Sequence, residues 1–284
     1  MQFRRATTLE AALAARSQWG ADGRILAGGT DVMVQYLHGE IIPEALIHIE
    51  AIDSLSAVTL NGRTTIGALT THRTLATTSA LVARHPALAA AARTVGGWQT
   101  QVKGTLGGNV CNASPAADTL PPLLVADAHV TLSSATAERR LAVQEFVLDR
   151  RTTALAPDEL LTSIDLEPLP ADSAEVYLKL GRRGAMEVAL VGLAVRLGFS
   201  NDGVVSSARI AFCSVGPTPR RVSDAEAALV GTTLDAEALD AAGAALAAAA
   251  TPIDDARATA SYRRRTLRGL LGQAARQCKE ESQR

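Results

Sequence analysis

The sequence predicts an α+β protein: short strands mixed with helices up to Pro170, and then a three-stranded antiparallel sheet backed by helices. Three observations predict this class. Short apolar runs and helical spacings alternate before Pro170, three longer strand-like runs follow it, and the remainder is Ala-rich and helical. With 284 residues, 47% of them hydrophobic, the chain can bury the cores that this architecture needs.

The first elements are predicted from hydrophobic spacing, caps and glycines. Helical spacing of apolar residues predicts a first helix that begins after Thr7 or Thr8, either of which can cap it. The segment "RILAGGTD" reads as a short buried strand that breaks at Gly28 and Gly29. "DVMVQYLHG" then predicts a helix that ends at Gly39.

Further strands and one helix are predicted before the domain boundary. Residues 45–50 and 64–68 are strand-like, and the Asn-Gly pair in "LNGR" predicts a hairpin turn before the second of them. Residues 85–95 are Ala-rich and helical, "AHVTL" and "RRLAV" form a hairpin, and "ELLTSIDLEP" is a strand that stops at Pro168. Turn-forming residues then place a domain boundary at 170–173.

The C-terminal part, residues 174–284, is predicted to be a sheet with helices. "EVYLKLGRR", "VALVGLAVRLGFS" and "VVSSARIAFCSV" are the three strands, with "SNDG" as a hairpin turn and "GPTPRR" closing them. Residues 224–250 and 256–277 are Ala-rich and predicted to be helical. The boundary makes residues 1–170 the first domain and 174–284 the second.

Composition and charge narrow the function classes. A net charge of -1 gives no basic surface for nucleic acid. No uncharged apolar run reaches the roughly 18 residues of a spanning helix, and the start lacks a signal-peptide core, so we expect a cytoplasmic protein without a membrane partner. Cys111, Cys213 and Cys278 form no C-x-x-C pair and the five histidines show no ligand spacing, so metal chemistry is expected outside this chain.

Two segments carry paired glycines: "AGGTD" at 27–31 and "GTLGGN" at 104–109. Paired glycines let backbone N–H groups converge on an anion without a Cβ in the way. Either pair alone is compatible with a plain tight turn, whereas two pairs together favour a bound diphosphate. Neither segment matches the Rossmann or the P-loop fingerprint, so a dinucleotide would lie in a cleft between two loops.

Asp118 is the only acid between Lys103 and Asp127, and it directly precedes "TLPPLL". It can cap a helix that begins near the prolines, or it can accept hydrogen bonds from a ligand's hydroxyl groups. The sequence leaves both readings open. Lys179 lies in the strand-like "VYLKLGRR", where a lysine is more often on the solvent face.

Five segments together resemble a known family. "ILAGGTD", "TTIGALTT", "KGTLGGNVCNASPAADTLPPLLVADA", "YLKLGRRGAME" and "GPTPRR", in this order, are similar to the FAD-binding medium subunit of molybdenum hydroxylases, the family of xanthine dehydrogenase and carbon monoxide dehydrogenase. The resemblance covers nearly the whole chain. It implies a PCMH-like FAD-binding region of two subdomains, about 1–55 and 56–170, followed by a three-stranded sheet with a helical bundle.

The resemblance also implies a cofactor site without a catalytic residue. FAD would lie extended between the glycine loops, the first cradling the diphosphate and the second holding its other side and part of the isoalloxazine surround. Asp118 matches the flavin-binding acid, Leu161 an apolar contact, Lys179 a lysine near the cofactor and Val95 an adenine neighbour. The implied residues are Leu26, Ala27, Gly28, Gly29, Thr30, Asp31, Val95, Thr105, Leu106, Gly107, Gly108, Asn109, Asp118, Leu161 and Lys179.

Two departures limit what the resemblance carries over. Where many members have Ile-Arg-Asn, this chain has Thr100, Gln101 and Val102, which loosens any assignment of side-chain hydrogen bonds to this turn. The cysteine-bearing insertion of phenol-type CoA reductases is missing. Since neither loop carries a paired histidine or cysteine anchor, FAD is expected to be non-covalent.

The implied function is electron transfer within a heteromeric complex. FAD would take electrons from 2Fe-2S clusters in a small partner subunit and pass them to a terminal acceptor, with the molybdenum cofactor in a large partner subunit. Dimerisation of the complex is left open. Two alternatives remain at this point: a free-standing FAD-dependent oxidoreductase with its own substrate pocket, and a non-catalytic nucleotide-binding module.

Overall fold

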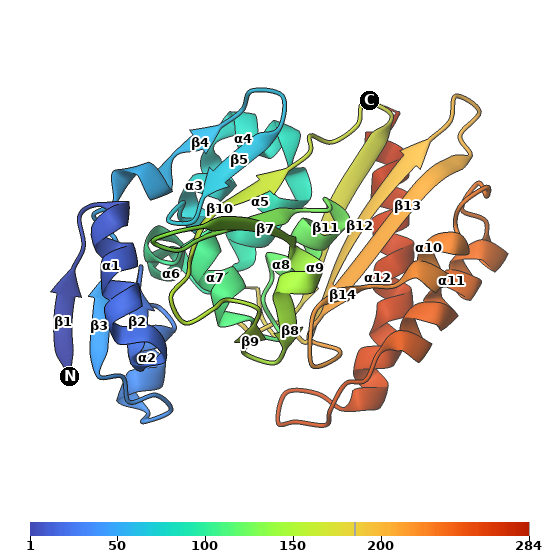
Figure 1. Cartoon of the computed structure of the whole chain (residues 1–284). Helices are drawn as coiled ribbons and strands as arrows, with labels where there is room; N and C mark the ends of the chain where they lie inside the picture. Colours follow the sequence, from blue (N-terminus) through green and yellow to red (C-terminus); the bar gives the residue numbers. More distant parts are fainter. Residues whose placement is uncertain (185, 284) are drawn as a thin grey trace.

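The computed structural model describes residues 1–184 and 186–283, which form three blocks side by side (Figure 1). The N-terminal block, residues 1–52, holds a parallel sheet in the order β1-β3-β2. Helix α1 packs on this sheet and begins after Thr8, whose hydroxyl accepts from the Ala11 N–H. Its elements are β1 (Gln2–Arg5), α1 (Leu9–Trp19), the 3-10 turn η1 (Gly20–Asp22), β2 (Gly23–Leu26), α2 (Val32–Leu37) and β3 (Ala45–His48).

The middle block, residues 53–169, is a five-stranded sheet covered by short helices. Strand β10 (Leu160–Leu166) is central and pairs antiparallel with β5 (Thr64–Gly67) and β6 (His129–Ser133). The edges are β4 (Val58–Thr59) and β7 (Glu138–Ala142), and β8 (Val147–Asp149) pairs with β9 (Thr152–Thr153). Its helical elements are η2 (Asp53–Ser56), α3 (His72–Thr77), α4 (Ser79–Arg84), α5 (Pro86–Thr94), α6 (Trp98–Lys103), α7 (Leu106–Asn112), α8 (Leu120–Val125) and α9 (Val143–Phe146).

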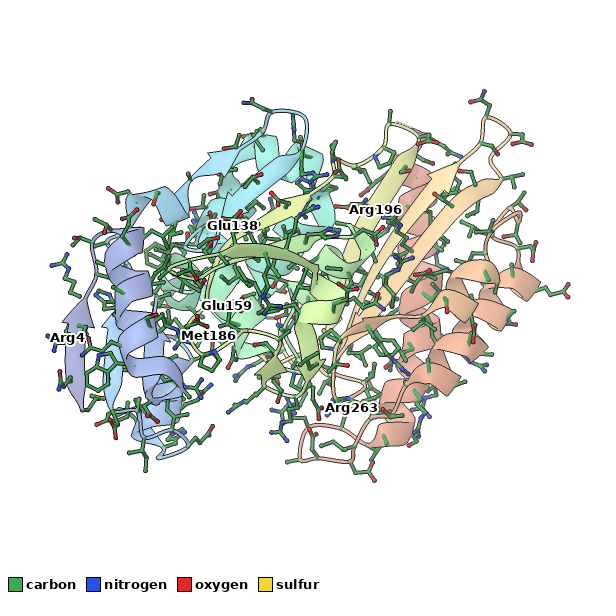
Figure 2. The ribbon with its side chains drawn as sticks, viewed as in Figure 1. Arg4, Glu138, Glu159, Met186, Arg196 and Arg263 are labelled. Atoms are coloured by element: carbon green, nitrogen blue, oxygen red, sulfur yellow. The ribbon has the colours of Figure 1, made fainter. Side chains whose placement is uncertain are left out.

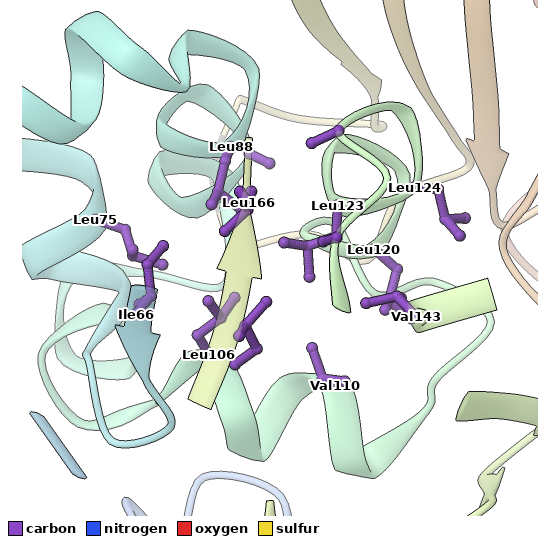
Figure 3. Packing of buried hydrophobic residues seen from close by; sticks show 14 of the residues in the cluster. Ile66, Leu75, Leu88, Leu106, Val110, Leu120, Leu123, Leu124, Val143 and Leu166 are labelled. Atoms are coloured by element: carbon purple, nitrogen blue, oxygen red, sulfur yellow. The ribbon is translucent and has the colours of Figure 1, made fainter. Parts of the chain in front are cut away.

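The core of the middle block lies between β10 and the helices. Figure 3 shows Ile66 of β5, Leu106 of α7 and Leu120 of α8 among the side chains that meet there, all fully buried. The same cluster includes Tyr177 and Ala194 from the C-terminal block. The middle and C-terminal blocks therefore share one apolar core.

The C-terminal block, residues 173–184 and 186–283, is an antiparallel sheet in the order β11-β12-β13-β14. Strand β12 is buried along its whole length, because Leu193 and Val195 pack with the helices while Ala194 between them faces the middle block. Its elements are β11 (Ser173–Leu180), β12 (Val191–Phe199), β13 (Val205–Cys213), β14 (Arg220–Arg221), α10 (Ser223–Ala227), α11 (Ala236–Ala249) and α12 (Ala260–Glu281).

The predicted α+β class and the three long antiparallel strands are confirmed, as are the hairpin turns in "LNGR" and "SNDG". Three details differ. The segment "GPTPRR" adds a short fourth strand, β14. The helix predicted over 224–250 is two helices, because the chain turns between them at Gly231 with φ +82°. The last helix begins at Ala260, after an ordered loop in which Asp255 bonds to Arg257.

None of the helices in residues 1–184 and 186–283 combines the length and the hydropathy that a membrane-spanning helix requires.

Candidate cofactor site

A cleft of about 1040 Å³ lies between the N-terminal and middle blocks, and both glycine loops border it. Its volume lies just above the usual range for ligand pockets, about 300 to 1,000 Å³. The C-terminal block contributes to the rim through the loop before β12, where Met186 and Val188 line the cleft. Figure 2 labels Met186, whose side chain comes from this loop. All three blocks therefore reach this cleft.

The first glycine loop, residues 27–31, presents unpaired backbone donors to the cleft. A Cβ on Gly28 would lie 1.6 Å from the carbonyl oxygen of Lys103, so only glycine lets this loop touch the second one. Gly29 has φ +72°, in the left-handed region that favours glycine. Within the described chain, four consecutive N–H groups here donate to no protein acceptor, those of Gly28, Gly29, Thr30 and Asp31. Such a run of free donors suits an anion.

The second glycine pair differs from the expected nest of free donors. It forms the first turn of α7, and its backbone N–H groups are already used: Gly107 donates to the Ala68 oxygen at 2.9 Å and Gly108 to Thr105 Oγ1 at 3.1 Å. A Cβ on Gly107 would lie 2.6 Å from the Ala68 Cβ. A Cβ on Gly108 would meet only Thr105 Oγ1, at 2.9 Å. Gly107 therefore permits close helix packing, and Gly108 gives the cleft a flat backbone surface.

Asp118 is a buried acid on the cleft wall and does not cap a helix. Thr119 precedes α8 instead, and it makes no side-chain cap bond. Asp118 Oδ1 accepts from the Tyr177 hydroxyl at 2.7 Å, and Oδ2 accepts from Lys179 Nζ at 2.8 Å. Burial raises the pKa of Asp118, and the charge of Lys179 opposes that rise. Because an ionised carboxylate has about four acceptor positions, Asp118 retains capacity for a ligand.

Comparison with known families decides the identity. Residues 1–169 match the family described as the FAD binding domain in molybdopterin dehydrogenase, and residues 176–278 match the CO dehydrogenase flavoprotein C-terminal domain. The chain belongs to the FAD-binding subunits of the molybdopterin dehydrogenases. These proteins are oxidoreductase subunits of the molybdenum hydroxylase family, with FAD as cofactor.

Curated relatives and solved structures agree with this assignment. The xanthine dehydrogenase FAD-binding subunit of Escherichia coli O157:H7 is 30% identical over 92% of this chain and 90% of that protein. The carbon monoxide dehydrogenase medium chain of Hydrogenophaga pseudoflava is 31% identical over 89% and 88%. In the reconstituted CO dehydrogenase of Oligotropha carboxidovorans, one chain superposes with a TM-score of 0.95 at 30% identity, over 99% of this chain and 98% of that one.

The residues of this FAD-binding subunit that border the cleft suit FAD. Free N–H donors suit the phosphates, the flat surface at Gly108 admits a planar or extended group, and Asp118 suits hydroxyl groups. The predicted residues that line the cleft are Ala27, Gly28, Gly29, Thr30, Asp31, Val95, Thr105, Gly107, Gly108, Asn109, Asp118 and Leu161.

Three predicted residues do not line the cleft of this FAD-binding subunit. Leu26 ends β2, where its carbonyl accepts from the Ile49 N–H. Leu106 is fully buried in the shared core. Lys179 lies behind Asp118, where its ammonium also donates to the Thr94 oxygen at 2.8 Å.

A polar chain that the sequence did not single out joins the first glycine loop to α7. Gln35 Nε2 donates to Asn112 Oδ1 at 2.9 Å, and Asn112 Nδ2 donates to Asp31 Oδ1 at 2.9 Å. Burial raises the pKa of Asp31. Gln35 lies one helical turn after Asp31, and this spacing is the only local signal in the sequence for the polar chain. Asn112 joins the two residues only through the tertiary structure, so its part could not be predicted.

His72 is a second residue of the FAD-binding subunit that sequence reasoning missed. It borders the cleft at the start of α3 and is 2% exposed. Burial lowers the pKa of His72 to about 4, so the imidazole is neutral at physiological pH. Its Nδ1 has no partner among the described residues.

Proposed function

We propose that this FAD-binding subunit passes electrons from 2Fe-2S clusters of a small partner subunit to a terminal acceptor. The molybdenum cofactor belongs to a large partner subunit, where the organic substrate is oxidised. The observation that carries the proposal is the cleft between the glycine loops, with free N–H donors on one wall and the buried Asp118 on another. When bound there, FAD supplies the redox chemistry.

The proposal assigns separate roles to residues around the cleft. The N–H groups of residues 28–31 bind the diphosphate, and Gly108 lets the cofactor approach the backbone. Asp118 accepts hydrogen bonds from flavin hydroxyl groups, while Val95 and Leu161 provide apolar contacts. Their positions on the cleft wall support these roles.

An apolar rim beside the cleft supports assembly with partner subunits. Met186 and Val188 line the cleft yet are 58% and 50% exposed, and Trp98 is 61% exposed. The Met186 N–H donates to the Gly96 oxygen, so these side chains belong to neighbouring segments. Exposed apolar surface beside a redox site is typical of a protein contact. A relative named the 6-hydroxypseudooxynicotine dehydrogenase complex subunit alpha, 29% identical, is also part of a complex.

Purification from the native host at native level tests the assembly. We expect this chain to be recovered with a small iron-sulfur subunit and a large molybdenum subunit, both identified by metal analysis and mass spectrometry. A lone flavoprotein that oxidises an organic substrate or reduces an acceptor unaided would contradict the proposal.

The mode of FAD binding is a separate prediction. Since neither glycine loop carries a cysteine or histidine anchor, we expect FAD to be held without a covalent bond. Acid precipitation of the purified protein is expected to leave the flavin in the supernatant. Flavin that stays in the washed pellet would show a covalent link.

Domain division and location complete the proposal. We propose domains at 1–170 and 174–284, with subdomains of about 1–55 and 56–170; the separate sheets of the three blocks support this division.

We also propose a cytoplasmic location. Free thiols at Cys111, Cys213 and Cys278 suit a reducing compartment.

A further inference from the structure

Asp118 connects two blocks of the molecule. It precedes α8 in the middle block, whereas Tyr177 and Lys179, which hold its two oxygens, lie on β11 in the C-terminal block. Residues two apart on a strand point to the same face, so this pair forms one edge of the contact between the blocks.

Neither Tyr177 nor Lys179 lines the cleft, but Asp118 does. Tyr177 is 6% exposed, and its hydroxyl donates to Asp118 at 2.7 Å. The Lys179 ammonium is fixed by Asp118 and by the Thr94 carbonyl oxygen, both at 2.8 Å. The contact of both side chains with the cleft wall therefore runs through the carboxylate of Asp118.

We propose that Tyr177 and Lys179 are positioning residues for the cofactor. Their hydrogen bonds orient the carboxylate of Asp118 as an acceptor for the flavin hydroxyl groups. The dinucleotide site is then complete only when the C-terminal block is docked. This inference rests on the proposed function, because it assumes that the cleft holds FAD.

The surroundings of Asp118 leave few groups that can change its charge. The titratable side chains that interact with Asp118 are Lys179, Tyr177 and the thiol of Cys213. The Cys213 sulfur lies 4.0 Å from the Tyr177 hydroxyl. Burial raises the pKa of the Cys213 thiol to about 12, and the pKa of Tyr177 is also raised, so both stay neutral in the working range. Loss of a donor to Asp118 therefore raises the pKa of that carboxyl group.

Tyr177→Phe removes one donor and keeps the ring. We expect the FAD dissociation constant to rise about three- to tenfold near pH 8. We also expect affinity to fall with decreasing pH, and to begin falling at a higher pH than in the parent, because a protonated Asp118 offers fewer acceptor positions. In an Asp118→Asn background, Tyr177→Phe is expected to change the dissociation constant by less than twofold.

Glu175→Gln provides a matched control on the same strand. Glu175 also joins the blocks, because its carboxylate accepts from the Ala87 N–H at 3.2 Å, and within its own block it binds Arg196 at 2.6 Å. Among the described residues, Glu175 makes no hydrogen bond or ion pair with Asp118. If docking of the blocks alone governed affinity, this variant would weaken FAD binding as much as Tyr177→Phe.

The measurement is FAD titration by fluorescence quenching from pH 5.5 to 9 on the full-length apoprotein and its variants. A parent protein that does not bind FAD would overturn the proposed function itself. If the parent binds FAD and Tyr177→Phe has the same dissociation constant and pH profile, only the positioning role is overturned. The same holds if Glu175→Gln weakens FAD binding as much as Tyr177→Phe does. If Tyr177→Phe does not fold, Lys179→Gln tests the same role by removing the other donor to Asp118. Lys179→Arg keeps a cationic donor and is expected to bind FAD with parental affinity. A Lys179→Arg variant that binds FAD as weakly as Lys179→Gln would contradict the positioning role.

Discussion

At the scale of single residues, Gly107 and Gly108 are adjacent but are constrained by different neighbours. A methyl group on Gly107 would press on Ala68, whereas one on Gly108 would face the cleft and touch only Thr105. Gly107→Ala is therefore expected to lower the free energy of unfolding by about 1 to 3 kcal/mol, the usual cost of overpacking.

Gly108→Ala is expected to act on the cofactor instead. Alanine gains about 1 kcal/mol of helix propensity over glycine, which roughly balances a disturbed Thr105 cap of similar size. We expect an apoprotein that melts near the parent temperature but binds FAD at least tenfold more weakly. Calorimetry and FAD titration on both variants check this, and equal affinity of Gly108→Ala and the parent would show that the cofactor stays away from this surface.

Asp118 gives a third prediction at this scale. Asp118→Asn keeps the shape and removes the charge, and loss of a charge-assisted bond to FAD is expected to weaken binding about ten- to a hundredfold. Both Asp118→Asn and Asp118→Ala are expected to destabilise the apoprotein, by about 3 to 5 kcal/mol, because each leaves the buried Lys179 charge without its partner. Unfolding in urea and FAD titration separate the two effects; an Asn variant with parental affinity would return Asp118 to a purely structural role.

The residue types at the cleft could be predicted from the sequence, but their partners could not. The glycine pairs and Asp118 are recognisable because few chemistries need them in that pattern. Nothing local shows that the oxygens of Asp118 accept from Tyr177 and Lys179, which lie 59 and 61 positions further along. The free donors of the second glycine pair were predicted wrongly, since Ala68 and Thr105 occupy them.

At the scale of elements, the two glycine loops are held in direct contact. Gly28→Ala cannot be accommodated, because its Cβ would overlap the Lys103 carbonyl group and force the loops apart. We expect the variant to lose FAD during gel filtration and to melt at a lower temperature than the parent. Normal FAD retention with an unchanged melting temperature would mean that the loops separate without consequence.

An exposed ion pair between the same two blocks provides the control. Lys103 Nζ lies 2.6 Å from Glu50 Oε1, but these side chains are 59% and 47% exposed. Exposed pairs contribute less than about 1 kcal/mol, so Glu50→Gln is expected to change stability and FAD retention little. The backbone contact, not the ion pair, then holds the loops together.

The long hairpins were predictable at this scale, and the short helices were not. The strands around "SNDG" carry their own turn signal, so local sequence determines them. Helix α7 depends instead on Ala68 and Thr70, whose oxygens accept from its first N–H groups. Helices of six or seven residues such as α3 and α7 are marginal alone and require such tertiary contacts.

At the scale of the whole molecule, two buried histidines predict sensitivity to acid. Burial lowers the pKa of His72 and His85 to about 4, and Arg196 and Arg84 add to the effect at His85. The unfolded chain takes up protons below about pH 6.5, while the folded state does not until near pH 4. Each histidine therefore leaves stability intact above pH 6.5 and removes up to about 3 kcal/mol as the pH falls to 4.

A variant isolates this contribution from that of the acids. His85 lies away from the cleft, and its Nε2 bonds to Thr64 Oγ1 at 2.8 Å, which Gln can imitate. Urea unfolding of the parent and His85→Gln from pH 7.5 to 4.5 is expected to show the variant gaining relative stability as the pH falls. A difference that stays constant with pH would mean that His85 has the same pKa in the folded and unfolded states.

The family could be identified from the sequence because its motifs are spread through both halves in a fixed order. The sharing of one core between the middle and C-terminal blocks was not visible in the sequence. It depends on residues such as Tyr177 and Ala194, whose apolar character looks the same whether they pack within a domain or across a boundary.

The ion pair between Asp118 and Lys179 also has a consequence for protein synthesis. The two residues are 61 positions apart, and a ribosome adds roughly 5 to 20 residues per second, so Lys179 is made about 3 to 12 s after Asp118. During that interval the nascent chain carries both glycine loops and the acid, but not the strand that fixes the acid. On the proposed role of Tyr177 and Lys179, tight retention of the flavin waits for translation to pass β11, and a ribosome stalled before it holds an unfinished site.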